Sequence, residues 1–189
     1  MAGYTYLKYI GPFEQDMVRA LKPLGKKAML HAYLVGHTDE PRGKTEWTVS
    51  GDYKWRHKLG NLHDSFASAV YVNGVLIQSS VQYIDNPISK KKDPRTGKNG
   101  RQTVKDYLRR VSFGAKNNEI VLVVVAAMFY TKWLEDADSG SGRFIVISPA
   151  REFINRHWWE YVGPVYRKYG LKDKPKTRVI KGEKIKGLS

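Results

Sequence analysis

The chain of 189 residues contains no cysteine. Disulfide bonds, thiolate metal sites and cysteine nucleophiles are therefore excluded by composition alone. Its longest apolar run falls far short of the roughly 20 residues that a membrane helix needs. The first residues, MAGYTYLKYIGPF, have neither a basic leader nor a long apolar core, so no signal peptide is expected. We therefore expect a soluble protein that is made and used without export and has no membrane partner.

Acidic residues are also scarce, with 18 Asp and Glu against 33 Lys and Arg, which gives a formal charge of +15 and a pI near 9.9. Such an excess indicates contact with nucleic acid, an acidic protein surface or a membrane surface, although basic segments can also serve only solubility. The charge concentrates in residues 90–110 and 167–186. The apolar fraction of 41% and the length are those of one folded domain.

A nucleotide-binding loop is suggested by the tripeptide at 43–45 (GKT), but the motif is incomplete. The motif needs a second glycine five residues before Gly43, so that backbone N–H groups can surround the phosphates. Thr38 stands at that position, and Glu40 and Pro41 crowd the segment. We therefore predict no nucleotide site here.

The five histidines do not have the spacing of a metal site. His31 and His37 are six residues apart, which is neither a zinc-finger nor a zincin spacing, and no carboxylate completes a set. Asp85, Glu119 and Glu135 could in principle form a metal-dependent nuclease site, but no carboxylate–x–Lys sequence follows in a strand. We predict no metal, no cofactor and no catalytic residue, and a small metal-dependent nuclease is the least favoured alternative.

Hydrophobic periodicity predicts helices near both ends of the chain. Apolar residues between 13 and 24 recur at spacings of three and four, Pro23 should break or kink the helix, and a second helical stretch should end near Gly36. A last helix is expected over 149–169, since proline is tolerated in a first turn. Gly163–Pro164 is a potential break within it.

The clearest strand signal is the uninterrupted apolar run at 120–127 (IVLVVVAA), which predicts a strand buried on both faces. Asn73–Gly74 is a hairpin turn between a strand at 66–72 and a returning strand at 75–83. Residues 144–147 predict a fourth strand. The fold class is therefore α+β, with a small antiparallel sheet of about four strands packed by N-terminal and C-terminal helices.

We predict a single α+β domain over 1–170, with extended arms at both ends. The N-terminal arm covers 1–11, and a basic C-terminal arm covers 171–189. Residues 85–117 form a long basic loop region, and a compact domain rarely keeps such a loop without a use.

Lysines and arginines on this loop suit sequence-independent contact with phosphates. The loop lacks the aromatic residues of a single-strand binding platform. A solvated loop, or one that pairs with an acidic neighbouring subunit, is an equal alternative. The candidate contact residues for DNA or a neighbouring subunit are Lys90, Lys91, Lys92, Arg95, Lys98, Arg101, Lys174, Lys176 and Arg178.

Three short motifs resemble those of tail-completion, or head–tail joining (neck), proteins of tailed bacteriophages. Residues 60–66 (GNLHDSF) resemble the family's Gly-x-Leu-x-x-Ser-Ile/Phe signature, 130–135 (YTKWLE) its Tyr-x-x-x-Leu-Glu segment, and 147–150 (ISPA) its entry into the last helix. The order of elements also matches, and the resemblance covers about 24–169. The matching residues are Gly60, Leu62, Ser65, Tyr130, Leu134, Glu135 and Pro149.

The chain departs from the family pattern on either side of these motifs. Lys58–Leu59 stands where Arg-Thr usually precedes the signature, and residues 136–138 (DAD) replace the Phe-Gly-Thr that commonly follows the glutamate. The loops at 37–57 and 85–117 look longer than the family needs. These departures concern the place in the neck more than the fold.

The resemblance implies a small α+β protein that assembles as a ring, typically six-fold, at the head–tail junction. It implies a virion structural protein without catalysis, made in the host bacterial cytoplasm and located in the neck or tail. The implied partners are copies of itself, the neighbouring connector and tail-tube proteins, and packaged double-stranded DNA passing through the channel. The alternative is a stand-alone basic DNA-binding protein.

Overall fold

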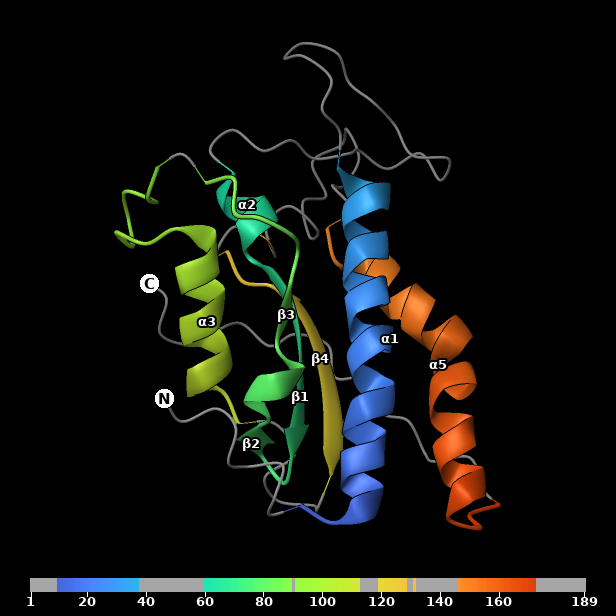
Figure 1. Cartoon of the computed structure of the whole chain (residues 1–189). Helices are drawn as coiled ribbons and strands as arrows, with labels where there is room; N and C mark the ends of the chain where they lie inside the picture. The colour runs from blue at the N-terminus through green and yellow to red at the C-terminus, as the bar shows by residue number, and fades with distance from the viewer. Residues whose placement is uncertain are drawn as a thin grey trace.

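The computed structural model describes residues 10–37, 60–89, 91–112, 119–128, 131 and 146–172, and the statements below concern these residues. They form an α+β fold in which a four-stranded antiparallel sheet lies between helices (Figure 1). The elements, in chain order, are α1 (Pro12–Gly36), α2 (Asn61–Asp64), β1 (Phe66–Val72), β2 (Val75–Leu76), the 3-10 turn η2 (Gln78–Ser80), β3 (Gln82–Tyr83), α3 (Gly100–Arg110), β4 (Ile120–Ala126) and α5 (Ser148–Lys168).

Strand β1 is the centre of the sheet. β4 pairs with its whole length, from Phe66↔Ala126 to Val72↔Ile120, so β2 and β3 share its other edge. The predicted hairpin is confirmed, because Asn73 and Gly74 have φ angles of 51° and 78°, the left-handed pair that a type I′ turn requires.

The returning strand predicted at 75–83 is interrupted. Leu76 pairs with Tyr71 and Tyr83 pairs with Ala67, so seven steps along this strand face only four along β1. The extra residues form η2. The alternation of polar and apolar residues over 75–83 predicts an unbroken strand, and it does not reveal a bulge of this kind.

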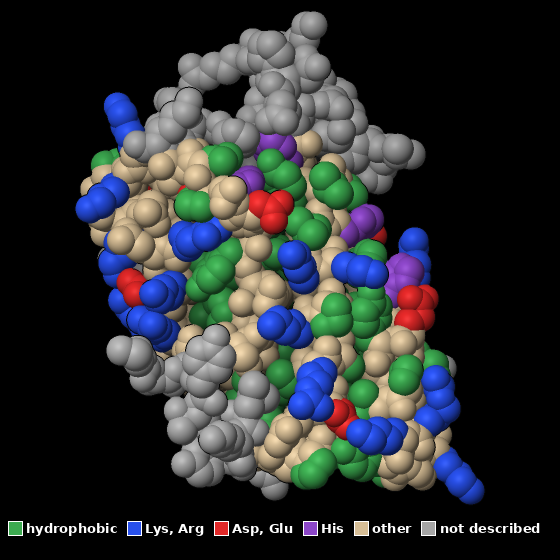
Figure 2. Space-filling model, in the orientation of Figure 1, with side chains coloured by type: hydrophobic (Ala, Val, Ile, Leu, Met, Phe, Trp, Pro, Cys, Tyr) green, Lys and Arg blue, Asp and Glu red, His purple; other side chains and the backbone are tan. Residues whose placement is uncertain are grey.

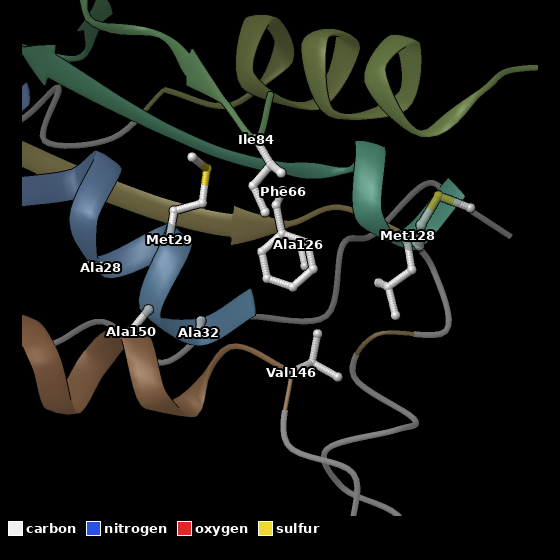
Figure 3. Close-up of a cluster of buried hydrophobic side chains, with 10 residues drawn as sticks. Ala28, Met29, Ala32, Phe66, Ile84, Ala126, Met128, Val146 and Ala150 are labelled. Atoms are coloured by element: carbon white, nitrogen blue, oxygen red, sulfur yellow. The ribbon is translucent and has the colours of Figure 1, made fainter. Parts of the chain in front are cut away.

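The sheet is covered on both faces, which explains why β4 is apolar along its whole length and β1 is apolar except for the buried Ser68. Phe66, Val70 and Val72 of β1 pack with residues of α1, and Ala67, Ala69 and Tyr71 pack with Val104 and Leu108 of α3. Figure 3 shows the order of layers as α3, sheet, α1 and α5, with Phe66 beside Met29 of α1 and Ala126 of β4. Helix α5 therefore packs mainly on α1.

Helix α1 runs without a break through Pro23, so the predicted break is wrong. Proline removes one intrahelical bond, the one to the carbonyl of Arg19. Both residues are exposed, and water can take the place of the lost donor there. Leu21 and Leu24 on either side are fully buried, and this burial holds one continuous helix. The predicted end near Gly36 is confirmed.

The predicted start of the last helix is confirmed, with Pro149 in the first turn of α5. The helix continues through Gly163 and Pro164, although Figure 1 shows a change of direction along its length. A fourth strand is predicted at 144–147, but Val146 and Ile147 lie in a bend that leads into α5. Residues 144 and 145 lie outside the described residues. Val146 is instead fully buried in the core beside Phe66.

Candidate functional site

The signature segment at 60–66 forms one turn of helix and a sharp entry into β1. Gly60 has a φ of 78°, and a Cβ at this position would lie 2.7 Å from the carbonyl oxygen of Ile88. Leu62 is buried in the core, and the Ser65 hydroxyl donates to the Leu62 carbonyl at 2.8 Å. The three signature residues predicted to be structural, Gly60, Leu62 and Ser65, thus shape this turn and its contact with the loop after β3.

Asp64, within this turn, fastens the beginning of the basic loop. Its carboxylate accepts the backbone N–H groups of Ile88 and Ser89, each at 2.9 Å, and also the Ser89 hydroxyl. The ring Nδ1 of His63 lies 2.8 Å from the same carboxylate. Burial disfavours the charged form, but the hydrogen bonds from Ser89, Ile88 and His63 outweigh it and lower the pKa of Asp64. The carboxylate is therefore held charged, with several donors on it.

The same turn fastens the far end of the loop. The side-chain oxygen of Asn61 accepts the Gly100 N–H at 3.2 Å, and a Cβ on Gly100 would lie 1.9 Å from the Asn61 carbonyl oxygen. Asn99 caps α3 in a reciprocal pair with Gln102, at 2.9 and 3.2 Å. Residues 60–65 thus fix both the start of the loop and the first turn of α3.

Helix α3 is held at its other end by β1. The buried hydroxyl of Tyr71 donates to the Leu108 carbonyl at 2.6 Å, and burial raises the pKa of Tyr71. Val104 and Leu108 face the sheet and are buried. The region 85–117, predicted as a long basic loop, therefore contains a regular helix over 100–110. The capping box of Asn99 and Gln102 was the sequence signal for this helix.

Two of the predicted contact residues are used within the fold. Lys98 forms an ion pair with Asp106, and this hydrogen bond lowers the pKa of the Asp106 carboxyl. Arg101 donates to the backbone carbonyl of Ile84 at 2.8 Å and to that of Asp85, and its guanidinium lies 4.9 Å from the centre of a tyrosine ring. Both cations stabilise the loop rather than project from it.

The other predicted residues divide between the surface and the segments outside the described ones. Lys91, Lys92 and Arg95 are exposed on the loop. The remaining predicted contact and motif residues lie outside the described residues, and they are Lys90, Lys174, Lys176, Arg178, Tyr130, Leu134 and Glu135. Pro149 lies buried in the first turn of α5.

The structure adds three cations that the sequence reading did not select, Lys105, Arg109 and Arg110. All three are exposed on α3, and none makes a hydrogen bond or ion pair with a described residue. Figure 2 shows Lys and Arg side chains gathered on the side of the molecule where Figure 1 places α3. The signal was present in the sequence, since 91–110 holds eight Lys and Arg against two Asp.

The outer edge of β4 is a second feature of the described residues. Asn73 N–H donates to the Glu119 carbonyl at 3.0 Å, and Ala127 N–H donates to the Ser65 carbonyl at 3.2 Å. Odd-numbered residues of β4 therefore turn their backbone groups toward β1, and even-numbered ones turn them away. Within the described chain, no partner covers the outward groups, which belong to Ile120, Leu122, Val124 and Ala126.

Helices cover both faces of β4, as the apolar run predicts, but the strand is less deeply buried than that prediction implies. Six of the seven residues of β4 are only half-buried, and among the described residues β1 is the one strand that pairs with it. The apolar run arose from packing of both faces by helices, which sequence periodicity cannot separate from a central place in the sheet.

Metal-ligand clusters and hollows are two further features to consider among the described residues. No group of three His, Asp or Glu among them could hold a metal ion. A hollow of about 310 Å³ lies between the hairpin and the end of α3, but neither a carboxylate nor a histidine lines it. Among the helices described, none is both long and apolar enough to cross a membrane.

We compared the chain with protein-family models, with curated proteins and with solved structures, and none of them matches it.

Proposed function

We propose that the chain is a non-catalytic subunit of a ring at the head–tail junction of a tailed bacteriophage virion. The observation that carries this proposal is the role of residues 60–65. In the chain order expected from the resemblance, this segment follows the N-terminal helix, leads into the hairpin and precedes the long strand and the C-terminal helix. Its glycine, leucine and serine each have a structural reason to be there.

The edge of β4 supports assembly from several copies. Edge strands of monomeric proteins are usually protected by lysine, proline or a bulge. Residues 120–126 (IVLVVVA) contain neither a charge nor a proline, and β4 pairs with β1 in unbroken register. Such an edge suits the addition of a strand from a neighbouring subunit.

The rigid body of the subunit consists of the sheet with α1, α3 and α5. The neighbours of this body would be further copies in a ring, six-fold in the family, together with connector and tail-tube proteins. A ring of this kind needs shape and adhesive surfaces rather than acid–base groups, and the described residues fit that requirement.

The composition of purified virions tests the proposal. Peptides of this chain should be found by mass spectrometry in particles purified through a density gradient, at the low copy number of a ring relative to the major capsid protein. A non-virion protein from the same infected cells is the control for carry-over. Absence of the chain from particles that retain their tails would overturn the proposal.

A further inference from the structure

We propose that the outer face of α3 binds the phosphate backbone of duplex DNA without reading its sequence. We define the α3 cationic face as Lys105, Arg109 and Arg110 together with Lys91 and Lys92 of the preceding loop. This face would be the DNA-contacting surface of the proposed ring subunit. Only the place of contact, the channel of the ring, rests on the proposed function.

The cations of this face are available to a ligand, whereas their neighbours are not. Lys98 is paired with Asp106, and Arg101 is bound to two backbone carbonyls. The five members of the α3 cationic face are exposed and make no hydrogen bond or ion pair with a described residue. Because an unpaired cation need not break an internal contact to bind an anion, these five carry the binding.

Three of the five cations lie on a helix that is fixed at both ends. Lys105 and Arg109 are one helical turn apart, about 6 Å along the axis, and Arg110 follows directly. The capping box at Asn99 fixes one end of the helix, and the hydrogen bond from Tyr71 to Leu108 fixes the other. Charges held in place on a helix lose little conformational freedom when they meet a polyanion.

The chemistry of the face favours nucleic acid over an acidic protein. A protein interface has an apolar core surrounded by a polar rim. The large hydrophobic side chains exposed among the described residues are Leu34, Ile88 and Leu171, and none of them is on α3. A surface of cations without an apolar centre matches contact with phosphates.

Duplex DNA is favoured over a single strand for a related reason. Single strands bind where exposed aromatic rings stack on the bases. The one aromatic residue of α3, Tyr107, is half-buried beneath the helix, and burial raises the pKa of its hydroxyl. The α3 cationic face therefore suits contact with phosphates without stacking on bases.

Helix α1 carries a matched set of cations on the other side of the sheet. Arg19, Lys22 and Lys26 recur at spacings of three and four, and Arg19 is paired with Asp16 at 2.9 Å. Removal of these three lowers the net charge by the same amount as removal of Lys105, Arg109 and Arg110. Comparing DNA binding by variants of the two sets therefore distinguishes a specific binding surface from a general effect of net charge.

The test is the salt dependence of binding of the full-length protein to a fluorescent duplex of mixed sequence. Each phosphate contact contributes about −0.9 to the slope of log Kobs against log salt concentration. The triple variant Lys105→Gln, Arg109→Gln, Arg110→Gln should flatten the slope by about 2.7, because three contacts are lost. The single variant Lys105→Gln should flatten it by about 0.9. Circular dichroism establishes that each variant is folded.

The α1 triple variant Arg19→Gln, Lys22→Gln, Lys26→Gln should leave the slope nearly unchanged. Equal flattening by both triples would overturn the proposal, as would absence of duplex binding by the wild type. Binding to poly-glutamate with the same loss in the α3 variant would show an acidic protein as the partner instead. Absence of the chain from virions would remove the proposed function and leave this result standing.

Discussion

The carboxylate of Asp64 accepts the backbone N–H of Ser89 at 2.9 Å, and so joins two segments that are 25 residues apart. One of these segments is the signature turn that leads into the central strand. The other begins the basic loop that ends at α3. The contact therefore ties the start of the loop that carries Lys91 and Lys92 to the turn at the edge of the core.

Replacement Asp64→Asn should lower the free energy of unfolding by about 1–3 kcal/mol. The buried NH2 group of asparagine would face N–H and O–H donors, from which it cannot accept a hydrogen bond. Urea denaturation at neutral pH measures this loss. Asp85→Asn is the control, because Asp85 is exposed and should change stability by less than about 0.5 kcal/mol. Equal effects of the two variants would contradict the role of Asp64.

The same variant should alter the response to acid. The pKa of Asp64 is lowered in the folded protein, so the stability from its charged form is complete above the ordinary carboxyl value of about 3.9 and is lost as pH falls through the lower folded value. Between about pH 5 and 3, wild type should lose more stability than Asp64→Asn. Parallel curves for the two proteins would show that Asp64 has an ordinary pKa.

Gly60→Ala should destabilise the fold by about 2–4 kcal/mol, because the new methyl group meets both an unfavourable φ and the backbone of Ile88. Gly97→Ala is the matched control. Gly97 also has a positive φ, 64°, but a Cβ there has no atom within 4 Å. The control should cost only about 1 kcal/mol, the conformational part of the penalty. The difference between the two melting curves measures the close approach of turn and loop.

Val124→Pro should leave a folded monomer and abolish assembly through β4. The N–H of Val124 points away from β1, so proline removes no bond of the described fold but blocks an added strand. Val123→Pro is the contrast, because its N–H points toward β1, and it should unfold the chain with a loss of about 3 kcal/mol or more. Native mass spectrometry and circular dichroism report the two properties. Unchanged oligomers in Val124→Pro would rule out the β4 edge as the assembly surface.

Tyr71→Phe should reduce stability at neutral pH by about 0.5–1.5 kcal/mol, since the hydrogen bond to Leu108 is lost. Burial raises the pKa of Tyr71 above its ordinary value of about 10, so its contribution is complete below that value and is lost as pH rises toward the folded pKa. The phenylalanine variant should therefore lose less stability than wild type above about pH 10. An identical alkaline response would contradict this.

The regular elements were predictable where a local rule decides them. The Asn73–Gly74 turn and the start of α5 at Ser148–Pro149 follow from backbone preferences, and the structure has both. The break at Pro23 was predicted wrongly because a local preference was outweighed by burial of Leu21 and Leu24 on the same helix. Tertiary packing is not visible in the local sequence.

The candidate site was predictable in location but not in detail. The basic segment at 91–110 was evident, but Lys98 and Arg101 were selected as contacts although their partners are Asp106 and carbonyls distant in sequence. Lys105, Arg109 and Arg110 are not among the predicted contact residues, because their exposure depends on how α3 is seated on the sheet. Only the helix, set by Asn99 and seated on β1, turns these residues outward.

Cryo-electron microscopy of purified virions, with a reconstruction focused on the head–tail joint, tests the central claim most directly. The account predicts a ring of density at this joint into which the sheet with α1, α3 and α5 fits. A joint whose density is fully explained by other chains, with no place for this fold, would contradict the account.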